Sequence, residues 1–228
     1  MKEEIIIISL GGSLIIPDTI DVSFLKDFKN LILSKIKEGK KFVIITGGGK
    51  TCRNYQNAAK EISIPSHEDL DWIGIASLKL NAELLRVIFG EYAYNEVIAD
   101  LSHPFTSEKP IIIGSAYKSG FSSDWDAVAA AKTVGAKKII NLSNTDYVYD
   151  SDPKKNPNAK KFENISWAEY RALIPAEWNP GLNTPFDPIA SKMAEEEGIS
   201  VMIINGKPIT NLQNYLNGEK FLGTIISL

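Results

Sequence analysis

The chain has 228 residues, a formal net charge of −3 and 44% hydrophobic residues. This length suits one large α/β domain with a sizeable core, and the slightly acidic balance gives no basic surface for nucleic acid or an anionic membrane. No apolar run approaches the roughly 18–20 residues of a membrane span. The single cysteine excludes an intramolecular disulfide and indicates the reducing cytoplasm. One cysteine and two histidines also argue against a zinc site.

The start of the chain predicts a βαβ unit. Residues 4–10 are isoleucine-rich, which indicates a strand buried on both faces, and Gly11-Gly12-Ser13 ends it. A helix capped by Asp21 or Ser23 follows, and residues 41–46 form a second strand-like run. Such a unit implies two parallel strands joined by a right-handed crossover.

Three consecutive glycines, Gly47-Gly48-Gly49, separate that second strand from a segment of helix-compatible composition. A glycine turn between a strand and a helix N-terminus gathers backbone N–H groups that can bind an anion. Lys50 and Arg53 come directly afterwards, which favours a phosphate site over a simple tight turn. A P-loop does not fit, because its first glycine would have to stand at Ile44.

A third loop of small residues, after those at Gly11-Gly12-Ser13 and Gly47-Gly48-Gly49, follows a predicted strand in the middle of the chain. The expected elements are a helix over 68–89, short strands over 97–99 and 111–113, a glycine-bearing loop over 114–124, a helix over 125–134 and a strand over 138–142. Ligands of an open parallel sheet collect at the carboxyl ends of its strands. The three loops therefore predict a site for a phosphorylated small molecule.

The last third of the chain continues the alternation of helices and strands. Ser166 and Glu169 form a capping box for a short helix. The other expected elements are an irregular stretch over 175–185, helices over 188–197 and 209–216, and strands over 201–204 and 223–227. With no flexible linker, residues 1–228 are expected to form a single α/β domain: a three-layer αβα sandwich around a central, mostly parallel sheet.

The order and spacing of these loops resemble the amino acid kinase (carbamate kinase-like) fold, and within it the UMP kinases, nearer the archaeal than the bacterial type. The resemblance covers essentially the whole chain. The motifs that carry it are Leu10-Gly11-Gly12-Ser13, Gly47-Gly48-Gly49-Lys50 with Arg53, Ser122-Ser123-Asp124, Asn144 to Tyr149 with Asp152-Pro153, Phe186-Asp187-Pro188 and Gly223-Thr224-Ile225-Ile226.

This resemblance implies transfer of the ATP γ-phosphoryl group to UMP, giving ADP and UDP without a covalent enzyme intermediate. It implies Mg²⁺ carried by ATP rather than by a protein metal site, and a homo-oligomer, a hexamer in this family. It also implies an acceptor-side lobe over about residues 1–137 and an ATP-side lobe over 138–228, which share one sheet.

The resemblance also implies roles for individual residues. Asp124 would act in catalysis, although Asp126 offers a second carboxylate nearby, and Lys50 is a candidate because it stands beside Gly49. The residues matched to ATP binding are Gly11, Gly12, Ser13, Gly49, Asn144, Asp146, Tyr149 and Asp152. Those matched to UMP binding are Gly48, Arg53, Asp71 and Ser123.

Two positions depart from the family pattern. Ser9 stands where many members of the fold carry a lysine, and Tyr147 stands where the ATP-side loop usually has a glycine. These departures keep open the alternative of a non-catalytic nucleotide-binding or storage protein. A second alternative is a kinase of the same fold that acts on another phosphorylated acceptor, such as isopentenyl phosphate. Isopentenyl phosphate kinases typically carry a histidine near the acceptor loop, and no histidine occurs between Gly47 and Tyr55 in this chain.

Overall fold

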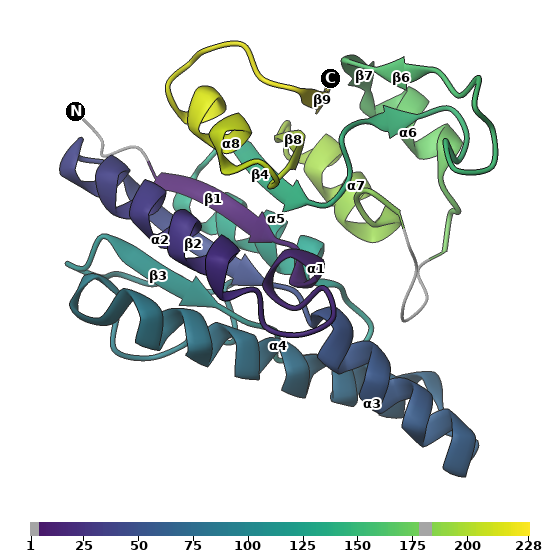
Figure 1. Ribbon diagram of the computed structural model, residues 1–228, viewed down its shortest axis with the longest axis horizontal. Helices are drawn as coiled ribbons and strands as arrows, with labels where there is room; N and C mark the ends of the chain where they lie inside the picture. The colour runs from purple at the N-terminus through teal and green to yellow at the C-terminus, as the bar shows by residue number, and fades with distance from the viewer. Residues whose placement is uncertain (1–4, 178–183) are drawn as a thin grey trace.

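The computed structural model describes residues 5–177 and 184–228, and it contains a seven-stranded sheet in the order β3-β2-β1-β4-β8-β9-β7 (Figure 1). Its strands are β1 (Ile5–Leu10), β2 (Lys41–Thr46), β3 (Ile111–Gly114), β4 (Lys138–Ser143), β7 (Asn164–Ser166), β8 (Ser200–Asn205) and β9 (Gly223–Ser227). Neighbouring strands run parallel except β8 and β9. The predicted mostly parallel sheet is therefore confirmed. A separate hairpin pairs β5 (Val148–Tyr149) with β6 (Lys161–Phe162).

Helices cover both faces of the sheet (Figure 1). They are α1 (Gly12–Ile15), α2 (Val22–Lys37), α3 (Gly49–Ile62), α4 (His67–Phe89), the 3₁₀ turn η1 (Gly90–Tyr92), α5 (Ser123–Val134), α6 (Trp167–Leu173), α7 (Pro188–Glu196) and α8 (Ile209–Leu216). Successive side chains of a strand point to opposite faces. Accordingly Ile8 packs into the core with α2, α4 and α8, whereas Ile7 packs with α5, α6 and α7.

Several helices begin at the polar residues that the sequence indicates. Asp21, rather than Ser23, caps α2 and accepts a hydrogen bond from the Phe24 amide at 2.9 Å. Ser166 and Glu169 form the predicted capping box of α6. Each such cap contributes about 1 kcal/mol by satisfying backbone donors that the helix itself leaves unpaired.

The predicted strand over 97–99 is wrong. Only Ile98 pairs there, through an isolated bridge to Gly114, because the chain bends at Glu96 and again at Ala99. Helix α3 begins at Gly49, inside the triple glycine, and not after it as the composition suggests. Part of the irregular stretch predicted over 175–185, residues 178–183, lies outside the described residues.

The parallel strands place the sequence motifs at one edge of the sheet. β1, β2, β3, β4 and β8 run in the same direction and end at Leu10, Thr46, Gly114, Ser143 and Asn205. The loops that follow them therefore emerge at the same edge, as predicted for a ligand site. Across the two described ranges, no helix is long and apolar enough to cross a membrane.

Candidate active site

The first two glycine loops are in direct backbone contact at the ends of β1 and β2. The Gly47 amide donates to the Leu10 carbonyl at 2.9 Å. A Cβ atom on Gly12 would lie 2.1 Å from the Gly49 nitrogen, so no other residue fits there without displacing the loops. Gly12 and Gly49 are buried in this contact, whereas Gly11 and Gly48 are half-buried beside it. The structure thus joins the two loops into one unit, called here the glycine junction (Gly11-Gly12 and Gly47-Gly48-Gly49).

Asp124 lies next to this junction, at the start of α5. Its Oδ1 accepts hydrogen bonds from the Ser9 hydroxyl and the Asn141 side-chain amide, each at 3.1 Å, and its Oδ2 accepts one from the Asp187 amide at 3.2 Å. Ser9 and Asn141 face each other on β1 and β4, two residues before Gly11 and Ser143 respectively. Burial, reinforced by the nearby Asp187 carboxylate, raises the pKa of Asp124 to about 7.

Asp187 lies in the site, although its sequence context suggested a structural role or one that supports the site residues. Its Oδ1 caps α7 by accepting from the Ile189 and Ala190 amides at 2.7 and 2.9 Å. Its Oδ2 accepts a short hydrogen bond from the Ser122 hydroxyl, which also caps α5. Burial raises the pKa of Asp187, as it does for Asp124. The sequence does indicate the capping role of Asp187, because Asp directly before Pro is a pattern typical of a helix start.

The two candidate carboxylates of α5 have different surroundings. Asp126 is 3% exposed, and its Oδ2 has no hydrogen-bond partner within the described ranges. Burial is the main cause that raises its pKa well above the ordinary range, and the Asp100 carboxylate adds to it. Within the described residues no hydrogen bond joins Asp126 to Ser9 or Asn141, so Asp124 is the carboxylate that the fold places beside the glycine junction.

On the acceptor side, α3 and α4 carry the polar residues expected to bind UMP. The Asp71 carboxylate accepts a hydrogen bond from the Gly120 amide at 2.7 Å, which ties α4 to the loop before α5. Burial raises the pKa of Asp71 despite this bond. Arg53 is exposed on α3 and forms no hydrogen bond or ion pair with the described part of the chain. Its guanidinium is therefore available to an external anion.

Lys50 and Ser123 stand in the first turns of the two helices that border the site. Lys50 is half-buried, and its amide donates to the Ile16 carbonyl at 2.9 Å, which joins α3 to the end of α1. Ser123 is the first residue of α5, directly before Asp124. The N-termini of both helices therefore point their partial positive charge toward the carboxyl edge of the sheet.

On the donor side, the last residue of β8 is hydrogen-bonded to the loop that follows β4. The Asn205 side-chain amide donates to Asp146 at 2.7 Å, and Asn144 is exposed in the same loop. Ser13 is half-buried in α1. Lys207, which sequence reasoning missed, donates to the Asp21 carboxylate at 2.5 Å and so links this region to the start of α2.

The remaining donor-side residues lie on the β5–β6 hairpin. Tyr149 pairs with Lys161, whose ammonium lies 4.3 Å from the ring centre of Tyr147. No described residue other than glycine has a positive φ, so tyrosine replaces the usual glycine at 147 without backbone strain. Asp152 is exposed and accepts a hydrogen bond from the Lys154 amide at 2.9 Å, and within the described residues no hydrogen bond joins it to Asp146 or the glycine junction.

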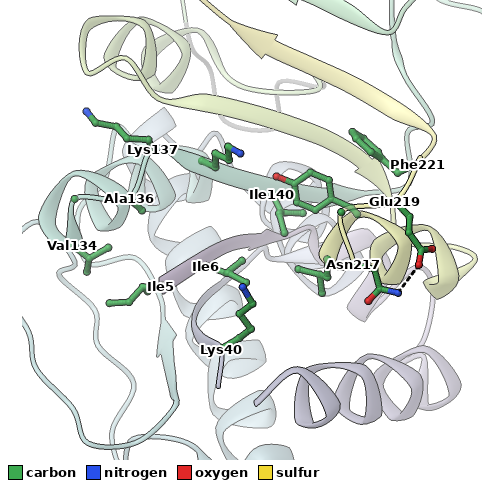
Figure 2. Close-up of a pocket in the computed structure, with 15 residues that line it drawn as sticks. Ile5, Ile6, Lys40, Val134, Ala136, Lys137, Ile140, Asn217, Glu219 and Phe221 are labelled. Atoms are coloured by element: carbon green, nitrogen blue, oxygen red, sulfur yellow. Dashed lines mark hydrogen bonds between the residues drawn. The ribbon is translucent and has the colours of Figure 1, made fainter. Parts of the chain in front are cut away.

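A cavity of about 870 Å³ lies at the amino-terminal ends of β1 and β4, away from the glycine junction (Figure 2). Its lining comes from these strands and the last residues of α5 and α8, and includes Ile5, Lys40, Lys137 and Phe221. None of the residues matched to ATP or UMP lines it. The cavity is therefore separate from the candidate active site.

Comparison with known proteins agrees with this geometry. The uridylate kinase of Thermococcus onnurineus is 34% identical over 224 residues, which cover 97% of this chain and 98% of the relative. That of Methanospirillum hungatei is 32% identical over 225 residues, covering 97% and 94%. The crystal structure of uridylate kinase from Archaeoglobus fulgidus has a TM-score of 0.78 at 28% identity and covers 97% of this chain and 99% of that one. Residues 4–205 match the amino acid kinase family, and the chain belongs to that family.

Proposed function

We propose that the chain is a UMP kinase that transfers the ATP γ-phosphoryl group to UMP. The observation that carries the proposal is the glycine junction: two phosphate-type loops in backbone contact, with the half-buried carboxylate of Asp124 bonded to Ser9 beside them. Such an arrangement can hold a donor and an acceptor phosphate side by side. Full-length relatives that are uridylate kinases support UMP as the acceptor.

The residues present suit a reaction that depends on positioning and charge neutralisation. The acceptor oxygen of UMP is already ionised at neutral pH, so no general base is needed. Gly11 and Gly12 would lie against the ATP phosphates, and Gly48 and Gly49 would approach the acceptor and the transferring phosphates. Arg53 would bind that phosphate through two parallel N–H bonds, for which its planar guanidinium is suited, and Asp71 would bond the UMP ribose.

The donor groups present fit a magnesium ion that arrives with ATP. Within the ranges that the structure describes, no three or more His, Cys, Asp or Glu side chains are grouped so as to hold a metal. Mg²⁺ commonly keeps phosphate and water ligands and takes only one or two carboxylates from the protein. When bound, the ion would neutralise phosphate charge, and Asp124 would be its protein contact.

We assign the ATP side to the second lobe, about residues 138–228, and the acceptor side to residues 1–137. The contact between Asn205 and Asp146 supports a shared donor-side surface at the ends of β4 and β8. Ser13, Asn144, Asp146 and Tyr149 would lie near the ATP phosphates, ribose and base. Asp152 would need the β5–β6 hairpin to approach the nucleotide, because its carboxylate now bonds its own turn.

Replacing Lys50 with alanine is expected to lower the turnover number about tenfold. Ser9 occupies the position where many family members have a lysine, and Lys50 is the nearest cation in sequence to the glycine junction. Removing one charge that stabilises the transferring phosphoryl group slows the chemical step without preventing binding. Steady-state kinetics with saturating ATP and UMP provide the measurement. An unchanged turnover number would exclude Lys50 from catalysis.

We further propose that the enzyme acts in the cytoplasm as a homo-oligomer, with a hexamer implied by the family resemblance. The outer face of α4 supports self-association, because Trp72, Leu80 and Val87 are 47%, 62% and 67% exposed at spacings of eight and seven residues. Such spacing places them on one side of the helix. Light scattering across micromolar concentrations tests the proposal, and a monomer throughout would contradict it.

A coupled ADP-release assay with UMP, CMP, dUMP and isopentenyl phosphate tests the proposed activity. Turnover with UMP as the preferred acceptor is the expected result. A preference for isopentenyl phosphate would replace the proposal with another kinase of the same fold. Binding of ATP without turnover of any acceptor would instead favour a nucleotide-binding or storage protein.

A further inference from the structure

A buried side chain of α4 reaches the glycine junction from behind. Asn81 is 1% exposed, and its side-chain amide donates to the Gly47 carbonyl at 2.7 Å. The residue before Gly47 is tied to the same helix, because the Thr46 hydroxyl donates to the Leu78 carbonyl at 2.9 Å. Helix α4 therefore holds the end of β2 and the first glycine through two adjacent hydrogen bonds.

The bond from Asn81 determines the orientation of the peptide unit between Gly47 and Gly48. In a trans peptide the C=O and N–H groups point in opposite directions. The peptide between Gly47 and Gly48 is trans, since the cis bond found among the described residues is the one between Lys207 and Pro208. With its carbonyl turned toward buried Asn81, this peptide directs the Gly48 N–H away from α4. Among the described residues, no hydrogen bond uses that N–H. It stands at the N-cap of α3, where backbone donors attract anions.

We propose that Asn81 is a positioning residue for phosphoryl transfer. By fixing the Gly47 carbonyl, it aims the Gly48 N–H at the phosphoryl group that passes between ATP and UMP. Three consecutive glycines would otherwise allow this peptide to rotate, because glycine accepts a wide range of backbone conformations. Rotation would also disturb Gly12, because the Gly47 carbonyl lies so close to it that a Cβ on Gly12 would stand 2.7 Å from the Gly47 oxygen. This inference rests on the proposed kinase activity.

Asn81→Leu is expected to lower the turnover number on the order of 30-fold, because a misdirected backbone donor no longer stabilises charge in the transition state. The KM values for ATP and UMP should change less than about threefold, since Arg53 and the other binding groups remain. The matched control is Asn211→Leu. Asn211 is also a buried asparagine, bonded to the backbone of Leu222 at 2.7 and 2.8 Å, and it does not contact the glycine junction. The Asn211→Leu variant should lose stability but keep its turnover number per folded molecule.

Asn81→Asp separates positioning from packing. A protonated aspartic acid can donate to the Gly47 carbonyl, whereas an ionised carboxylate cannot. The turnover number of this variant, divided by that of the wild type, should therefore rise as the pH falls. Full turnover in Asn81→Leu, or a ratio for Asn81→Asp that does not change with pH, would overturn the inference. If instead the wild type phosphorylates no acceptor, the proposed function itself fails.

Discussion

Replacing Asp124 with asparagine is expected to lower the turnover number on the order of 10³-fold and yet to stabilise the ligand-free protein at pH 8. The loss of activity follows because the variant removes the carboxylate that would organise Mg²⁺ and the reacting phosphates. The gain in stability follows because folding buries an ionised carboxylate beside that of Asp187. The asparagine oxygen can still accept hydrogen bonds from Ser9 and Asn141.

The sign of the pH dependence follows from the raised pKa. The pKa of Asp124 is about 7 in the folded protein, against an ordinary value of 3.8. Its contribution to stability is fully present below about pH 4 and is lost as the pH rises through about 7. The variant should thus lose less stability than the wild type between pH 5.5 and 8.5. At pH 8 we expect a gain of about 1–2 kcal/mol, or roughly 3–6 °C in Tm, by thermal unfolding.

Asp126→Asn is the matched control, because it removes another buried carboxylate of the same helix whose pKa is raised by burial. It should also stabilise the protein at pH 8, but its turnover number should stay within about threefold of the wild type. Loss of activity in Asp126→Asn with full activity in Asp124→Asn would reverse the assignment of the two residues. A lower Tm for Asp124→Asn at pH 8 would contradict the electrostatic argument.

The fold could be predicted well where burial on both faces determines the residue type. A central parallel strand needs apolar, β-branched residues throughout, so the strand over 41–46 has the bounds expected from sequence. The helix over 209–216 also has its expected bounds. Short elements do not have this pattern. The four residues of α1 and the two-residue strands β5 and β6 are too short for any periodicity and were missed, and Val97–Ala99 imitated a strand.

The candidate site could be predicted as a set of loops but not as a set of contacts. The glycines were recognisable because two strand ends had no side chains to obstruct a ligand. The family resemblance favoured Asp124 over Asp126, but the residues alone could not settle that choice, because only the packing of α5 determines which carboxylate reaches β1. From sequence, Asp187 had only a structural or supporting role, whereas in the structure its Oδ1 caps α7 and its Oδ2 bonds Ser122 beside Asp124. A sequence pattern cannot separate two roles of one carboxylate.

Replacing Arg53 with alanine is expected to raise the KM for UMP about 100-fold, while the KM for ATP changes less than about threefold. A pair of charge-assisted hydrogen bonds to the acceptor phosphate is worth about 3 kcal/mol, and each 1.4 kcal/mol corresponds to roughly a tenfold change in affinity. Because Arg53 is exposed and has no partner among the described residues, its removal should leave Tm unchanged.

Initial rates measured while each substrate is varied in turn test this prediction. Arg53→Lys should give an intermediate KM for UMP, since it keeps the charge but loses the planar fork. Lys60→Ala removes a cation from the last turn of the same helix and should have no effect on either KM. Equal increases in the KM for ATP and for UMP would mean that Arg53 does not bind the acceptor. The glycine junction would then lack its acceptor-side anchor, and the division between a UMP lobe and an ATP lobe would lose its main support.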